Sequence, residues 1–107
     1  MTEKRRNPRL DLKLPIILRY NGRLLPATML NLSCGGVFIR TEGRQVASDT
    51  PVELIFDLGE KAKDISMRGR VIRVESGKEG TDVGVEFTNL FSLSHKTVQE
   101  YLGKNLN

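Results

Sequence analysis

Residues 12–32 read LKLPIILRYNGRLLPATMLNL and carry the strongest structural signal in the chain. Apolar and polar residues alternate through Leu12–Tyr20, and this period of two is typical of a strand with one buried face. Asn21-Gly22 follows at once and favours a two-residue hairpin turn. A second apolar stretch, Leu24–Leu32, comes next. The segment therefore predicts two antiparallel strands, with Pro15 at an edge position or beside a bulge.

The rest of the chain repeats this pattern of short alternating stretches between turn residues. We expect four further strands and then a helix, at residues 37–39, 52–58, 65–74, 82–87 and 92–104. The apolar face of the helix would consist of Leu93, Val98, Tyr101 and Leu102. Ser92 or Ser94 is the candidate cap at its start, and Gly103 is the candidate end. The pattern predicts a single all-β domain: a basic arm (residues 1–9), a six-stranded antiparallel barrel (10–90) and a C-terminal helix.

Length and composition limit the function classes. The chain has 107 residues, of which 38% are hydrophobic and 28% charged, as in one small globular domain. Neither a membrane-spanning run nor a secretory signal is visible, so we expect no membrane insertion. The single cysteine, Cys34, and the single histidine, His95, argue against a disulfide framework and against a Cys/His metal site. A single cysteine suits a reducing compartment, which predicts a cytoplasmic protein. Cys34 and His95 could form a nucleophile–base pair, but we interpret them as a small buried thiol and a surface histidine, and so expect no enzyme.

The basic charge is concentrated at the N-terminus. The net charge is +4, and four basic residues, Lys4, Arg5, Arg6 and Arg9, stand among the first nine with only one acidic residue. Arginine presents a planar fork of donors that suits phosphate oxygens and guanine O6/N7, and it also stacks on bases. This arm lacks an apolar anchor, so we expect it to be mobile in the absence of a ligand. It favours a ligand that carries phosphate and a purine, the alternative being a solvated tail.

A second polar cluster, Asn31-x-Ser33-x-x-Gly36, follows the second predicted strand. Asn31 and Ser33 lie two residues apart, so in an extended segment they would point to one side and offer uncharged groups to a base edge. Gly36 would take a positive φ or let a ligand approach the backbone. The alternative is an ordinary turn, in which the two polar side chains bond to nearby backbone.

Taken together, the two clusters resemble the signature of the PilZ domain family. That family is marked by an RxxxR motif and, further along, a [D/N]xSxxG motif. Arg5-Arg6-Asn7-Pro8-Arg9 matches the first, and Asn31-Leu32-Ser33-Cys34-Gly35-Gly36 matches the second. Residues 69–72 and 83–87 look like later strands of the family, so the likeness runs from Lys4 to about Leu90.

The resemblance implies a six-stranded barrel and a stand-alone receptor for cyclic di-GMP, a bacterial second messenger. It implies an arginine arm that becomes ordered on binding and a signal that passes to a partner protein. The ligand-binding residues that it implies are Arg5, Arg9, Asn31, Ser33 and Gly36, with Lys4, Arg6 and Arg73 as second-tier candidates. Arg5 and Arg9 would bind phosphate and guanine, and Asn31 and Ser33 would contact the base edge beside Gly36.

Two positions depart from the family pattern. Asn31 stands where many members have aspartate, so a neutral hydrogen bond would replace a charge-assisted one. Arg73 stands roughly where many members place an aromatic residue. Its guanidinium can stack on guanine instead, the alternative being a solvated strand residue.

Two other function classes compete with a nucleotide receptor. One is a PilZ-like module that binds a protein and not the nucleotide, and the two intact motifs argue against it. The other is a small nucleic-acid-binding barrel, which would need a basic groove with aromatic platforms. The chain has no Trp, and most of its four Phe and two Tyr fall at inward strand positions. We therefore expect cyclic di-GMP and an unidentified effector protein as partners, with no nucleic acid polymer, cofactor or metal.

Overall fold

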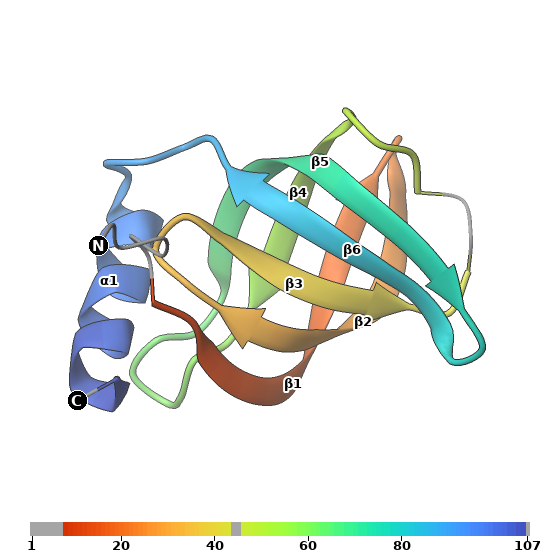
Figure 1. The fold of residues 1–107 in the computed structure, drawn as a ribbon. Helices are drawn as coiled ribbons and strands as arrows, with labels where there is room; N and C mark the ends of the chain where they lie inside the picture. Colours follow the sequence, from red (N-terminus) through yellow and green to blue (C-terminus); the bar gives the residue numbers. More distant parts are fainter. Residues whose placement is uncertain (1–7, 44–45, 107) are drawn as a thin grey trace, which may run out of the picture.

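Six strands and one helix form the computed structural model, which describes residues 8–43 and 46–106 (Figure 1). The elements are β1 (Leu10–Tyr20), β2 (Arg23–Leu32), β3 (Gly36–Thr41), β4 (Pro51–Phe56), β5 (Ile65–Gly77), β6 (Gly80–Phe87) and α1 (Leu93–Asn105). Neighbouring strands are antiparallel and close into a barrel in the order β1-β2-β3-β6-β5-β4. Figure 1 shows α1 across one end of this barrel. The predicted six-stranded antiparallel barrel with a C-terminal helix is confirmed.

The alternation of the sequence places one face of each strand inside the barrel. The completely buried strand residues include Leu18, Met29, Leu32, Ile39, Leu54, Met67, Val71 and Val83. Burial of such a side chain stabilises a fold by about 1.5–3 kcal/mol, so this shared interior holds the strands together. The predicted hairpin is also confirmed. Asn21 and Gly22 have φ angles of 51° and 77°, as a type I′ turn requires, and Tyr20 pairs with Arg23.

Two bulges change which side chains face outward. The pairing of β2 with β3 shifts register between Met29 and Asn31, and that of β5 with β6 shifts between Val71 and Arg73. An extra residue on one strand reverses the alternation beyond it. Asn31 and Arg73 each lie two residues after a buried side chain, yet both reach the outer surface of the barrel. A third register shift precedes Pro15 in β1, as that proline predicted.

The helix has a predicted cap, but its end and its buried face differ from the prediction. Ser92 is the cap, since its Oγ accepts a hydrogen bond from the His95 N–H at 3.0 Å. Gly103 does not end the helix, because it has no left-handed φ and α1 continues to Asn105. Leu93 is 85% exposed, so its predicted place on the apolar face is wrong. The buried residues of α1 are His95, Val98 and Leu102, which share one helical face, whereas Tyr101 is half-buried.

An ion pair joins β3 to β6 outside the interior. Arg40 Nε and one terminal nitrogen donate hydrogen bonds to the two carboxylate oxygens of Asp82 at 2.6 and 3.1 Å. Its other terminal nitrogen contacts Glu79 at 3.0 Å. The hydrogen bonds from Arg40 hold the pKa of Asp82 below its ordinary value. The pair therefore stabilises the fold above the ordinary aspartate pKa of about 3.9, and this contribution is lost as the pH falls through the lowered pKa.

We expect Asp82→Asn to flatten the acid limb of the stability profile. The free energy of unfolding should fall less steeply below about pH 4 than in the parent, because the asparagine takes up no proton. Urea denaturation at several pH values measures this slope. Asp49→Asn, which removes a carboxylate whose side chain is 85% exposed, is the control and should leave the slope unchanged. A parent-like slope in Asp82→Asn would show that the ion pair does not contribute.

Candidate functional site

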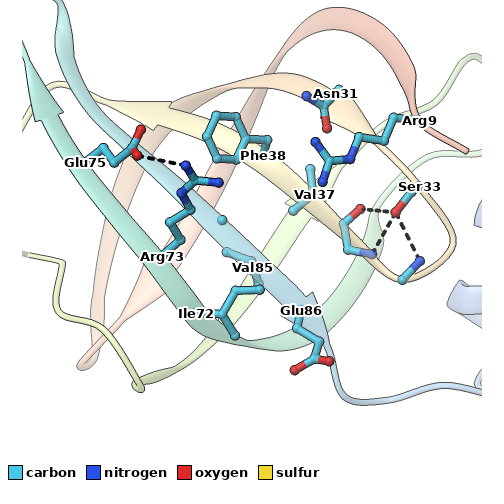
Figure 2. A pocket seen from close by; sticks show the side chains of 13 residues that line it. Arg9, Asn31, Ser33, Val37, Phe38, Ile72, Arg73, Glu75, Val85 and Glu86 are labelled. Carbon is cyan, nitrogen blue, oxygen red and sulfur yellow. Dashed lines mark hydrogen bonds and ion pairs between the residues drawn. The ribbon is translucent and has the colours of Figure 1, made fainter. Parts of the chain in front are cut away.

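A groove of about 660 Å³ lies on the outer surface of the barrel (Figure 2). Its size lies within the range of about 300–1,000 Å³ that is typical of small-ligand sites. It is lined by Arg9, Asn31, Ser33, Gly35, Gly36, Val37, Phe38, Ile72, Arg73, Glu75, Gly84, Val85 and Glu86. The groove thus brings together the five described residues that the sequence singled out: Arg9, Asn31, Ser33, Gly36 and Arg73. Lys4, Arg5 and Arg6 lie outside the described residues.

Strand register places the two motifs side by side. Leu10 pairs with Leu32 in the antiparallel β1–β2 ladder, so Arg9 lies opposite the start of the turn at Ser33. Figure 2 shows Arg9 and Asn31 at the same end of the groove as Ser33. The last arginine of the first motif therefore reaches the second motif because β1 and β2 are paired along their length.

The turn between β2 and β3 uses the Ser33 side chain internally. Ser33 Oγ accepts hydrogen bonds from the backbone N–H groups of Gly35 and Gly36, both at 3.2 Å, and donates to the Gly36 carbonyl at 3.3 Å. Only 8% of Ser33 is exposed. The Asn31 side chain makes no hydrogen bond within residues 8–43 and 46–106, and it lines the groove. Asn31 is thus available to a ligand, whereas Ser33 first of all shapes the turn.

Gly36 is needed for close packing between strands. It does not have a positive φ, which was one of the two alternatives that the sequence left open. A Cβ at this position would overlap the backbone carbonyl oxygen of Val85 on β6. The glycine therefore lets β3 approach β6 at the start of the strand, beside the groove.

In the middle of the groove, the lining at Gly84 is backbone alone, because glycine has no side chain. Phe38 and Arg73 both pair with Gly84, so the three residues form one row across β3, β6 and β5. A Cβ on Gly84 would lie 3.3 Å from Arg73 Cβ and 3.6 Å from the Phe38 ring. An aromatic ring and a guanidinium thus flank a glycine, and both are planar groups on which bases stack. Phe38 belongs to neither motif and was not predicted as a site residue, although the apolar residues Val37 and Ile39 on either side of it signal an outward position.

The charges of the described groove are balanced. Arg9 and Arg73 contribute two positive charges, and Glu75 and Glu86 two negative ones. Arg73 donates a hydrogen bond to Glu75 at 2.9 Å (Figure 2). Both side chains are more than half exposed, so this ion pair is weak, and a ligand can displace it at small cost.

The cysteine and the histidine are arranged differently from the prediction. His95 is buried, with 6% exposed, and Cys34 is only half-buried. His95 Nε2 contacts the Cys34 carbonyl oxygen at 2.7 Å, so the histidine bonds to the backbone and not to the thiol. Burial raises the pKa of the Cys34 thiol, which makes it a poorer nucleophile at neutral pH. The His95–Cys34 contact therefore joins the helix to the backbone of the turn and does not form a nucleophile–base pair.

The described part of the chain, residues 8–43 and 46–106, holds no group of three or more His, Cys, Asp or Glu side chains that could bind a metal ion. It likewise contains no helix with the length and apolar character needed to cross a membrane.

Comparison with known proteins gives one family and a set of similar structures. The family model of the PilZ domain matches residues 3–104. No curated protein matches the sequence significantly. The structure resembles the Bacillus subtilis inhibitor of motility MotI/DgrA, with 20% identity, a TM-score of 0.79, and coverage of 99% of this chain and 53% of that chain. It also resembles the PilZ domain of Escherichia coli YcgR with c-di-GMP, with 16% identity, a TM-score of 0.72, and coverage of 97% of this chain and 92% of that chain.

A third similar structure is that of the K. pneumonia MrkH–c-di-GMP complex. It is 18% identical, with a TM-score of 0.73 and coverage of 98% of this chain and 53% of that chain. At such identities the likeness shows a common barrel fold. The chain spans about half the length of the MotI/DgrA and MrkH chains.

Proposed function

The chain belongs to the PilZ domain family, and on this premise we propose that it is a receptor for cyclic di-GMP. The observation that carries the proposal is the groove that holds Arg9 of the first motif and Asn31 of the second at one end. The YcgR domain and MrkH, which have the same fold, are described as complexes with c-di-GMP. We propose a cytoplasmic receptor without catalytic activity.

The side chains of the groove match the chemistry of this ligand. Cyclic di-GMP presents phosphate oxygens and guanine bases. The Arg9 guanidinium is a fork that binds either phosphate or the O6/N7 edge of guanine. The Asn31 amide offers a donor and an acceptor to the rest of a base edge. Phe38 and Arg73 supply planar faces on either side of Gly84, where a purine ring can stack.

The N-terminal arm completes the site in this proposal. Lys4, Arg5 and Arg6 would add the positive charge that the balanced lining of the groove lacks. Ordering about six residues costs roughly 6–12 kcal/mol of backbone freedom. Charge-assisted hydrogen bonds of about 1.5–3 kcal/mol each offset that cost, which gives an affinity on the order of micromolar. The closed arm would then form a new surface for an effector protein.

A calorimetric titration with cyclic di-GMP tests the proposal, with GTP and a short single-stranded DNA as controls. We expect saturable binding of cyclic di-GMP with a dissociation constant on the order of micromolar and no saturable heat with either control. Absence of cyclic di-GMP binding would favour the protein-interaction module, and DNA binding would favour the nucleic-acid-binding barrel.

Ordering of the arm is a separate expectation with its own measurement. We expect the backbone ¹⁵N relaxation of Lys4–Arg9 to report fast motion in the free protein and restricted motion with cyclic di-GMP bound. The hairpin turn at Asn21-Gly22, which is not part of the groove, should relax alike in both states. An arm that is equally rigid in both states would contradict the ordering step even if the nucleotide bound.

A further inference from the structure

We propose that His95 is a positioning residue that couples α1 to the turn of the binding groove, residues 33–36. The inference rests on the proposed function for the ligand that the turn contacts. It concerns a histidine that belongs to neither motif and does not line the groove. Its side chain would hold the turn in the geometry that the nucleotide meets.

The contact between His95 and the turn has a defined chemical form. His95 Nε2 lies 2.7 Å from the carbonyl oxygen of Cys34. A carbonyl oxygen only accepts hydrogen bonds, so Nε2 must carry the proton and donate it. The imidazole is almost fully buried, and the Phe87 ring meets it edge-on with ring centroids 6.4 Å apart. Water therefore competes little for this hydrogen bond, which strengthens it.

Two consecutive carbonyl groups of the turn are held from outside it. His95 donates to Cys34, and the Phe87 N–H at the end of β6 donates to Gly35 at 2.9 Å. Ser33 Oγ holds the turn from within. Thus β6 holds the carbonyl group of Gly35 and α1 holds that of Cys34. The two hydrogen bonds together fix the path of the backbone next to Asn31. Loss of the helix contact would leave one of these two external supports.

A series of hydrogen bonds fixes the position of His95 in turn. The Arg68 N–H on β5 donates to Asn89 Oδ1 at 3.0 Å, and Asn89 Nδ2 donates to Ser92 Oγ at 3.4 Å. Ser92 Oγ caps α1 by accepting the His95 N–H. The series joins β5, the linker after β6, the helix start and the turn. The barrel therefore fixes the position of His95, and His95 in turn fixes the backbone of the turn beside the groove.

The coupling must act in both directions. If a docked α1 favours the turn geometry that binds the nucleotide, then bound nucleotide favours a docked α1 to the same extent. The start of α1 should therefore gain protection from amide hydrogen exchange when cyclic di-GMP binds. The docking of α1 at the surface therefore depends on whether the groove is occupied.

Three variants test the proposal: His95→Gln, His95→Leu and Leu102→Ala. The glutamine amide nitrogen can take the place of Nε2 and donate to Cys34, whereas leucine cannot donate. Leu102→Ala removes a buried side chain seven residues further along the same helix and leaves the His95 side chain in place, so it controls for loss of stability. Binding is measured at a temperature at which all variants are folded.

We expect His95→Leu to bind cyclic di-GMP roughly threefold to tenfold more weakly, and His95→Gln and Leu102→Ala to bind within about twofold of the parent. In the free protein, the Gly35 and Gly36 amides should exchange faster by a similar factor in His95→Leu alone. The proposal is overturned if Leu102→Ala loses as much affinity as His95→Leu, or if His95→Gln behaves like His95→Leu. If the parent does not bind cyclic di-GMP, the proposed function fails, and the exchange rates of the two amides still decide the role of His95.

Discussion

Replacement of both Arg5 and Arg9 by alanine is expected to abolish measurable cyclic di-GMP binding, and either single replacement to weaken it at least about tenfold. Hydrogen bonds to charged groups contribute about 1.5–3 kcal/mol each, and each tenfold change in affinity corresponds to about 1.4 kcal/mol. Arg9 directly precedes β1, lines the groove and lies outside the buried interior. The free energy of unfolding should therefore hardly change. Calorimetry measures the affinity, and urea denaturation measures the stability.

A matched variant separates the site from the overall charge. Arg23→Ala removes the same charge from an exposed position at the hairpin that is not part of the groove. Binding that depends on specific contacts should survive Arg23→Ala almost unchanged. If Arg9→Ala bound as tightly as the parent, Arg9 would not belong to the site. Equal losses in Arg9→Ala and Arg23→Ala would point to unspecific electrostatic attraction.

The barrel could be predicted because its strands follow a simple rule. Alternation between apolar and polar residues marks each strand, and Asn21-Gly22 fixes the first hairpin by its turn geometry. The two bulges follow no such rule. Each adds an apolar residue, Leu30 or Ile72, to a strand that already contains several, so the sequence does not show where the alternation reverses.

The candidate site was predictable only in part for the same reason. The motifs single out Arg9 and Asn31, but the row of Phe38, Gly84 and Arg73 depends on the register of three strands. The burial of His95 depends on a turn 61 residues away in the sequence. A lone histidine among the polar residues of a short helix is ordinarily a surface residue, so the local sequence pointed the wrong way. Long-range pairing set these positions, and no local pattern encodes it.

Gly36→Ala is expected to lower the free energy of unfolding by about 3 kcal/mol or more, in contrast to the arginine variants. The added Cβ would overlap the Val85 carbonyl oxygen, which is backbone and cannot rotate away, so β3 and β6 would have to separate.

Gly103→Ala is the matched control, because a Cβ there meets no atom within 4 Å. In a helix, alanine in place of glycine should raise stability by up to about 1 kcal/mol. Urea denaturation compares the two, and a parent-like stability of Gly36→Ala would contradict the packing explanation. Nucleotide binding by Gly36→Ala should be lost through damage to the barrel, whereas Arg9→Ala should lose it in a barrel of unchanged stability.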